Sequence, residues 1–331
     1  MDGSSGQQGS NLAKLVHPSL CPILILLSRL KPSAVTSEAG DSLDPFIFLP
    51  FIMKCSVKSN FRSRILAARA LTGLISNEKL PIVLLNIASE LPCTRNVSSD
   101  ASNSIDTQNG TCHTFNSLHG MLLQLNTLLD NNCRCLADSS KKDAILKDLI
   151  EILAIRSWIG KFQLCPCPIL NSCFLGVLDN MLSIATTCQM SRSIAAIWNL
   201  VWELSSEFLD LEEPQKLSYH DPTIVELRKQ AAVSYFNCLY KTSKEIAEED
   251  ILMPGTCSST ASSLLRVSDL DSALSRFQER LRGCMSDTSY EVRLATFKWL
   301  VLFLKSAGLK IEGGNSSSHE IKTYLLYNID L

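Results

Sequence analysis

The stretch that decides the fold is Phe61-Arg-Ser-Arg-Ile-Leu-Ala-Ala-Arg-Ala-Leu-Thr-Gly-Leu-Ile75, which has the pattern of one helix. Its alanines favour helix and are small enough for a neighbouring helix to approach closely. Ser59 or Asn60 is suited to cap its start, because such side chains accept hydrogen bonds from free backbone N–H groups. Apolar residues recur at helical spacing and predict one buried stripe. The predicted stripe comprises Phe61, Ile65, Ala68, Thr72 and Ile75, with Leu71 and Leu74 beside it.

The segments on either side of this helix are also helical in pattern. Residues 46–53 form an apolar run that Pro50 is expected to kink or interrupt, because proline lacks the N–H group a helix interior needs. A third helix is expected over residues 79–89. Three short helices joined by polar turns are typical of an α-solenoid, so residues 44–91 are predicted to be its core repeat unit.

Polar segments divide the rest of the chain. Residues 1–43 are expected to be a flexible N-terminus with a lead-in helix, and residues 92–112 a disordered insertion rich in Ser, Asn, Asp and Thr. Residues 113–309 carry further degenerate helical repeats, and residues 310–331 form a C-terminal tail. Asp221 and Pro222 mark a helix start as N-cap and first helical residue. Since no alternating strand pattern is convincing, the predicted class is all-α.

A short repeated pattern identifies the kind of solenoid. Arg64, Arg192 and Arg228 are each followed three and four residues later by paired alanines, and Arg293 begins a looser copy. In HEAT repeats such an arginine follows a polar turn and precedes small residues at which neighbouring helices touch. Arg192 and Arg228 are 36 residues apart, close to the HEAT period of about 40. The sequence therefore predicts a HEAT/armadillo-like α-solenoid with long polar loop insertions.

Composition narrows the class of protein. Of the 331 residues, 46% are hydrophobic and 19% are charged, so the chain is too apolar to be disordered throughout. The net charge of −2 excludes a generally basic nucleic-acid coat protein. The first ten residues lack the basic region of a signal peptide, and the early apolar run of residues 20–30 is too short to span a bilayer. We therefore expect no membrane insertion. The chain has 13 cysteines, an odd number, so we expect free thiols and a location in the cytosol, with the nucleus as an alternative.

Charge is one-sided in the core unit. Between Asp44 and Glu78 there is no acidic residue. The five basic residues in that interval are Lys54, Lys58, Arg62, Arg64 and Arg69. Arg62 and Arg69 share a helix face because they are seven residues apart, whereas Arg64 points roughly opposite. One interpretation is a solvated face with one structural arginine, and the other is a patch that contacts phosphates.

The search for catalytic chemistry finds none. No glycine-rich phosphate loop, Gly-x-Ser-x-Gly elbow or S-adenosylmethionine loop is present. The pairs Cys133-x-Cys135 and Cys165-x-Cys167 are spaced by one residue, whereas structural zinc sites use two to four. His119 lies in an apolar neighbourhood that favours packing or a local bond over a catalytic base. We therefore expect no enzyme activity, metal, cofactor or small-molecule substrate.

Two stretches carry a resemblance to a known family. Phe48-Leu-Pro-Phe-Ile-Met-Lys-Cys55, followed by Arg64-Ile-Leu-Ala-Ala-Arg-Ala-Leu71, resembles part of the thyroid adenoma-associated (THADA) family. Asn116-Ser-Leu-His-Gly-Met-Leu-Leu-Gln124 is similar to the Asn-x-x-His-Gly-x-Leu-Leu-Gln element that follows in that family. Together the motifs cover about residues 44–130, and the chain resembles a C-terminal fragment or short isoform of a family member.

The resemblance implies a function. The family consists of long helical-repeat proteins similar to the non-catalytic partner of an FtsJ-type methyltransferase, which methylates the ribose 2′-oxygen at position 32 of the tRNA anticodon loop. It implies a regulatory scaffold whose residues Lys54, Lys58, Arg62, Arg64 and Arg69 contact tRNA phosphates. Asn116, His119, Gly120 and Gln124 match the family element, and a packing or partner-contact role is expected for them. For Arg64 a bond within the scaffold is the second interpretation. The alternative function is a protein–protein adaptor with no RNA contact of its own.

Overall fold

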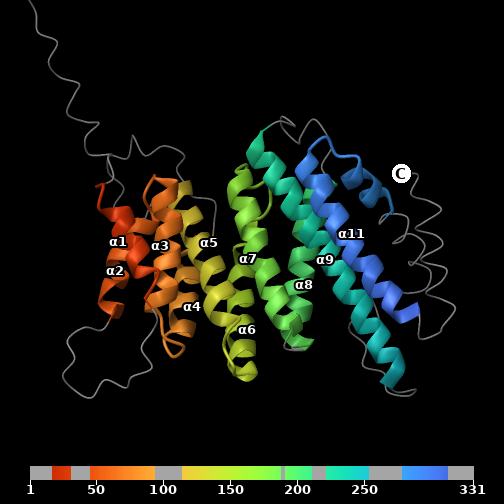
Figure 1. Cartoon of the computed structure of the whole chain (residues 1–331), viewed down its shortest axis with the longest axis horizontal. Coiled ribbons are helices and arrows are strands. Elements are labelled where there is room, and N and C mark those ends of the chain that lie inside the picture. The colour runs from red at the N-terminus through yellow and green to blue at the C-terminus, as the bar shows by residue number, and fades with distance from the viewer. Residues whose placement is uncertain are drawn as a thin grey trace, which may run out of the picture. The chain divides into compact units, whose positions relative to one another are not determined.

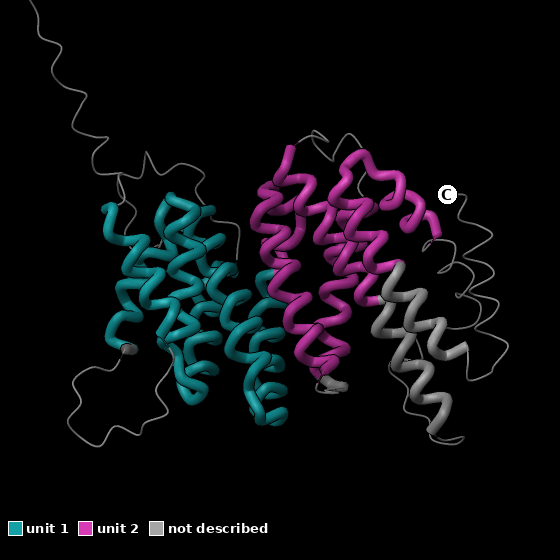
Figure 2. The backbone as a smooth tube through the Cα atoms, viewed as in Figure 1, with its two compact units in different colours: residues 1–156 teal, residues 157–331 magenta. Residues whose placement is uncertain are grey.

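The computed structural model describes residues 17–30, 45–93, 114–187, 191–210, 221–252 and 278–311, and every regular element in them is helical. The chain divides into two compact units, unit 1 up to Arg156 and unit 2 from Ser157 (Figure 2). The predicted insertion at 92–112 and the tail at 310–331 lie almost wholly outside these residues, as does most of the predicted N-terminal segment.

Unit 1 is a stack of short helices (Figure 1). Its elements are α1 (Leu20–Leu27), η2 (Pro45–Phe48), α2 (Leu49–Ser56), α3 (Phe61–Leu74), α4 (Leu80–Glu90), α5 (Phe115–Leu128), η3 (Leu129–Cys133) and α6 (Ser139–Ile155). Helix α3 packs between α1 and α5, and α4 packs against α6, so helices two apart in the chain are neighbours. This next-but-one packing is the geometry of a helical-repeat stack.

Unit 2 repeats this arrangement. After η4 (Ser157–Ile159) come α7 (Pro168–Thr187), α8 (Ser191–Leu209) and α9 (Pro222–Leu252), then a helix at residues 278–285 and α11 (Tyr290–Ile311). Helix α9 packs against α7 and α11, and α8 packs against α7 and α9. In its core the ring of Phe236 stacks on Trp299 at 4.7 Å. The predicted all-α helical-repeat class is confirmed.

Most residues of helix α3 are buried, but its buried face differs from the predicted stripe. Ala67, Ala68 and Ala70 are buried as expected, but Phe61 is 56% exposed. Ile65 and Thr72 are only half-buried. The prediction was wrong at these positions because small residues let helices approach α3 from more than one side. At Gly73 a β-carbon would lie 2.9 Å from the backbone oxygen of Leu27, the last residue of α1, and 2.4 Å from that of Leu30, so the end of α1 approaches α3 there at backbone distance.

Helix boundaries follow local chemistry. The side chain of Asn60 accepts a hydrogen bond of 2.9 Å from the N–H of Ser63, which confirms one of the two predicted caps of α3. Asp221 accepts a 2.8 Å bond from Thr223 at the start of α9. Pro50 does not interrupt α2; it lies in the first turn, where a missing N–H costs nothing.

Two of the four predicted repeat arginines, Arg64 and Arg293, share a contact with the backbone. One terminal nitrogen of Arg64 donates to the carbonyl oxygens of Lys58 and Ser59, each at 2.8 Å. The same nitrogen of Arg293 donates to the carbonyls of Asp287 and Thr288. In both cases the acceptors lie six and five residues before the arginine. Each arginine therefore fixes the turn that precedes its own helix, which gives the sequence repeat a structural reason.

Arg228 forms a salt bridge between neighbouring helices of the stack. One of its terminal nitrogens lies 2.7 Å from a carboxylate oxygen of Asp287, and the two side chains are only 4% and 13% exposed. The salt bridge therefore joins α9 to the turn before α11. The side chain of the fourth predicted arginine, Arg192, lies outside the described residues.

Helix α7 is long and apolar enough to cross a membrane by length and composition alone. Within unit 2, however, 61% of that apolar window is buried, and α7 packs against α8 and α9. Phe174, Leu178 and Met181 are fully buried there. These properties are those of a core helix.

Candidate nucleic-acid interface

Four of the predicted basic residues are exposed on unit 1. Lys54 lies near the end of α2, Lys58 lies in the following turn, and Arg62 and Arg69 lie on α3. Within the described residues the structure records no hydrogen bond or ion pair for these side chains. The described residues from 17 to 77 also contain no aspartate or glutamate. Within the described part of this segment, residues 17–30 and 45–77, no acidic neighbour therefore neutralises the positive charge.

The exposed side of α3 is narrow. Arg62, Ile65, Arg69 and Thr72 are its exposed or half-buried residues after the first position, at offsets of three, seven and ten. These offsets keep them on one face of the helix. Arg62 and Arg69 are thus two turns apart on a rigid rod, about 10 Å along the axis at 1.5 Å per residue. We call Lys54, Lys58, Arg62 and Arg69 the basic face.

In the structure Arg64 is buried, unlike the other four residues predicted to contact phosphates. Only 7% of its surface is exposed, and its guanidinium donates to Lys58, Ser59 and His119. A guanidinium held by buried acceptors is not presented to a phosphate outside the protein. The second interpretation of Arg64, a bond within the scaffold, is confirmed by these hydrogen bonds.

His119 is the buried partner of Arg64. Its Nδ1 accepts a hydrogen bond of 3.1 Å from Nε of Arg64, so the neutral ring carries its proton on Nε2. Burial and the charge of Arg64 lower the pKa of His119 to about 4. The Phe61 ring lies 5.5 Å from the imidazole, between centroids, and also contacts the Arg64 guanidinium. The bond of His119 is therefore not the local one that was predicted but a contact with a residue 55 positions earlier in the chain, and a neutral buried ring has no role as a surface cation.

Gly120 explains why this segment places a glycine after the histidine. A β-carbon at position 120 would lie 1.9 Å from the backbone oxygen of Ser56. Helix α5 therefore touches the end of α2 at backbone distance, next to the turn that carries Lys58. Gln124 is fully buried, and neither its oxygen nor its nitrogen has a hydrogen-bond partner in the described part of the chain. Asn116 is half-buried near the start of α5.

The basic face is thus built on a buried support. Arg64 fixes two carbonyls of the α2–α3 turn, His119 fixes Arg64, and Gly120 lets α5 approach closely enough to carry both. Cations on a backbone held this way can contact phosphates by charge and shape, without reading base sequence. The sequence motif indicated that His119 and Gly120 belonged together. It gave no sign that their contacts were Arg64 and Ser56.

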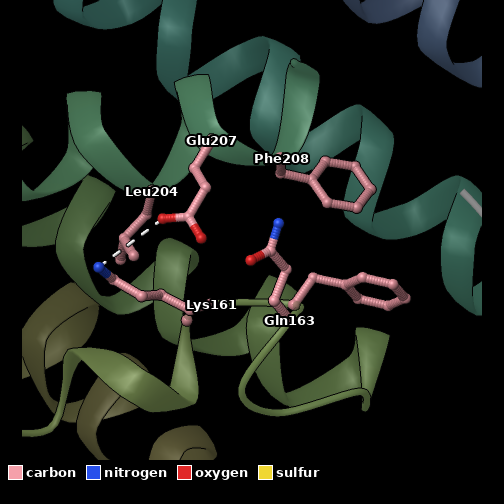
Figure 3. Close-up of a pocket in the computed structure, with 7 residues that line it drawn as sticks. Lys161, Gln163, Leu204, Glu207 and Phe208 are labelled. Atoms are coloured by element: carbon pink, nitrogen blue, oxygen red, sulfur yellow. Dashed lines mark ion pairs between the residues drawn. The ribbon is translucent and has the colours of Figure 1, made fainter. Parts of the chain in front are cut away.

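A depression in unit 2 does not have the features of an active site. Residues 160–163 and α8 line it, and it is a shallow hollow open to solvent that encloses no cavity (Figure 3). Pockets that bind small molecules are enclosed clefts of about 300–1,000 Å³. Lys161 lies 2.7 Å from Glu203 and 3.7 Å from Glu207, and the hydrogen bond to Glu203 raises the pKa of the lysine. A lysine nucleophile needs the opposite shift.

The cysteine pairs are split between interior and surface. Cys133 and Cys165 are buried, whereas Cys135 is exposed and Cys167 is half-buried. Among the described residues, no group of three or more His, Cys, Asp or Glu is gathered as metal ligands would be.

Comparison with known proteins gives matches to one family. Residues 4–128 match the family model described as "Trm732, C-terminal TPR repeats". The chain is 30% identical over 169 residues to the mouse "tRNA (32-2'-O)-methyltransferase regulator THADA", 29% identical over 184 residues to the human protein and 28% identical over 165 residues to the chicken protein. These matches cover 49%, 54% and 49% of this chain. No solved structure matches.

The matched segment is only a small part of each relative. In each case it spans 8% of the relative's length. The family model covers α1 to α5, and so includes the whole basic face and its buried support. Over residues 4–128 the chain is therefore similar to the C-terminal repeats described by that family model.

Proposed function

We propose that this chain is a non-catalytic regulatory scaffold that holds tRNA for 2′-O-methylation of the ribose at position 32 by a partner methyltransferase of the FtsJ type. The names of the relatives, regulators of a tRNA (32-2'-O)-methyltransferase, support the regulatory part. The observation that supports the tRNA part is the basic face: four exposed cations on a stretch whose described residues, 17–30 and 45–77, contain no acid, beside the buried Arg64–His119 pair. The proposed location is the cytosol.

A scaffold of this kind contributes orientation. Holding a substrate in register with an enzyme removes translational and rotational freedom before the chemical step, and needs no nucleophile or cofactor from the scaffold. If the basic side chains stood on a flexible loop, part of this advantage would be lost, because the loop would have to become ordered when tRNA binds. The α2–α3 turn avoids that loss, because its carbonyl oxygens are already bound by Arg64.

The test is binding of the purified chain to unmodified tRNA at low and moderate salt, beside the Arg62→Glu/Arg69→Glu variant. Phosphate contacts release counterions, so affinity should fall steeply with salt. Each lost contact should lower the slope of log K against log salt by about 1, and the double variant therefore by about 2. Helical content, followed by circular dichroism, should be unchanged because both side chains are exposed.

The matched control is Lys147→Glu/Lys298→Glu, which makes the same charge change at two exposed lysines outside the basic face. The tRNA affinity of this control should stay within about twofold of wild type if tRNA contacts only the basic face. Equal losses in both double variants would mean that net charge alone governs binding. Absence of binding by the folded wild-type chain would contradict RNA contact and leave the adaptor alternative.

Catalysis is tested separately. The isolated chain, given S-adenosylmethionine and unmodified tRNA, should transfer no methyl group. Addition of the chain to the partner methyltransferase should raise methylation at position 32, and the Arg62→Glu/Arg69→Glu variant should raise it less. Methyl transfer by the chain alone would overturn the proposal.

A further inference from the structure

The first residue of α3 is an exposed aromatic side chain among the cations of the basic face. Phe61 is 56% exposed, and the residues from Val57 to Arg62 are all exposed. Lys58 lies three positions before Phe61 in the α2–α3 turn, and Arg62 follows it directly. Single exposed apolar residues are common and need no special explanation. Phe61 differs from the ordinary case because basic residues lie on both sides of it in the chain.

Buried groups hold the ring of Phe61 in place. Its centroid lies 5.5 Å from that of the His119 imidazole and 5.7 Å from the guanidinium carbon of Arg64. These two partners are only 5% and 7% exposed, so the ring lies against the protein on one side and is open to solvent elsewhere. The backbone beneath it is fixed as well, because the side chain of Asn60 accepts a hydrogen bond from the N–H of Ser63. Little side-chain freedom therefore remains to be lost when a ligand binds.

A fixed aromatic ring between cations suits one kind of ligand. Nucleobases are flat and stack on aromatic side chains, which strengthens binding for each base that is stacked. Lys58 and Arg62 supply positive charge for the phosphates on either side of such a base. Bases inside a duplex are already stacked on their neighbours, so an unpaired base is the one that can reach the ring. A phenyl ring has no hydrogen-bonding group, and therefore accepts unpaired bases without reading which base is present.

We propose that Phe61 is a stacking platform for one unpaired base of a bound RNA, and that Lys58 and Arg62 contact the phosphates next to that base. This role rests on the proposed function, binding of tRNA by the basic face, and narrows that binding to nucleotides whose bases are unpaired. Phosphate contacts alone would accept a duplex as well as a single strand. The ring of Phe61 is the part of the surface that distinguishes a strand with accessible bases from one without them.

The experiment uses three fluorescein-labelled probes of about 12 nucleotides, within the range of known single-strand binding sites. The first is an unstructured RNA strand, and the second is an equally long strand of stable abasic spacers, which carries the same phosphates without bases. The third is the RNA strand annealed to its complement. Binding to the full chain is followed by fluorescence anisotropy. The wild-type chain should bind the intact strand at least about fivefold more tightly than the abasic strand.

Variants then separate stacking from packing. Phe61→Leu keeps an apolar side chain over the buried pair but removes the ring, and should weaken binding of the intact strand by about 5- to 100-fold. Its affinity for the abasic strand and the duplex should stay within about twofold of wild type, and its salt slope should be unchanged, because no phosphate contact is lost. Phe61→Trp restores an aromatic ring and should restore the affinity. The control Phe297→Leu makes the same change at a phenylalanine of unit 2 that is 49% exposed, and should bind as wild type does.

Two results would overturn the stacking role. One is equal binding, or equal absence of binding, of the intact and abasic strands by a wild-type chain that binds tRNA, which would leave the proposed function in place. The other is an equal loss of affinity for all three probes in Phe61→Leu, since the ring would then support the backbone without contacting a base. A folded wild-type chain that binds neither these probes nor tRNA is a different outcome, because it would contradict RNA contact itself and the stacking role with it.

Discussion

Nε of Arg64 donates a 3.1 Å hydrogen bond to Nδ1 of His119, which lies 55 residues later in the chain. This bond joins α3 to α5 beside the turn between α2 and α3, and Arg64 also holds that turn by two carbonyl oxygens. The stability of unit 1 and the placement of Lys58 therefore depend on one buried pair.

Removal of the imidazole should destabilise the chain. His119→Ala leaves the N–H of Arg64 buried without its acceptor, which costs about 1–3 kcal/mol in the free energy of unfolding. Urea unfolding measures this change. The control His17→Ala alters an exposed histidine and should change stability by less than about 0.5 kcal/mol. Equal effects of the two substitutions would contradict a special role for the buried pair.

Acid should weaken the same contact. The pKa of His119 is lowered to about 4 in the folded chain, below its ordinary value of 6.5, so the folded state favours the neutral ring. Its contribution is complete above pH 6.5 and is lost as the pH falls toward 4, by about 3 kcal/mol. His119→Gln keeps an acceptor but does not titrate, so its unfolding free energy should fall less over this interval. Parallel pH profiles of the two proteins would refute the prediction.

Gly120 should not tolerate a side chain. In Gly120→Ala the new β-carbon would meet the Ser56 backbone oxygen at 1.9 Å, and backbone cannot rotate away as a side chain can. We expect a loss of about 2–4 kcal/mol, comparable to severe overpacking or larger. Gly176→Ala in α7 is the control, because a β-carbon added there would have nothing within 4 Å. It should stabilise the chain by up to about 1 kcal/mol, since alanine favours helix.

Breaking the Arg228–Asp287 pair should destabilise unit 2 by leaving a charge buried. Asp287→Asn removes the carboxylate 2.7 Å from a guanidinium that is 4% exposed, and we expect a loss of about 3–5 kcal/mol. The double variant Arg228→Leu/Asp287→Asn removes both charges. It should be more stable than Asp287→Asn alone, as measured by thermal unfolding in a double-mutant cycle. Additive losses would mean that the pair is not coupled.

Local features of the fold could be predicted from the sequence, whereas contacts between distant segments could not. Helix α3 and its Asn60 cap depend on residues a few positions apart, and the repeated arginine marked turns of one kind. The end of α6 could not be read from its own residues, because its cause is distant. The helix ends at Ile155, and Arg156 then donates to the backbone oxygens of Ser89 and Leu91.

The candidate site shows the same limit. One-sided charge identified the basic face, and four of its five predicted cations are exposed. Periodicity placed Phe61 in the core, but a residue at the first position of a helix is buried only if a neighbour reaches that far. Here Phe61 instead covers the Arg64–His119 pair from the solvent side. The partner of Arg64 is fixed by how α5 returns to α3, which no short pattern encodes.

The arginine contact holds the preceding turn by its backbone, independently of which side chains the turn carries. Arg64 and Arg293 bind carbonyl oxygens, which every residue possesses, so the side chains of the turn take no part in these bonds. One such turn displays Lys58 at the surface, whereas in the other Asp287 is paired with Arg228. At an exposed position such as Lys58, mutation can therefore reverse the charge of a turn while its backbone remains in place. A helical-repeat protein built on this arrangement can acquire new surface contacts, repeat by repeat, without a change of fold.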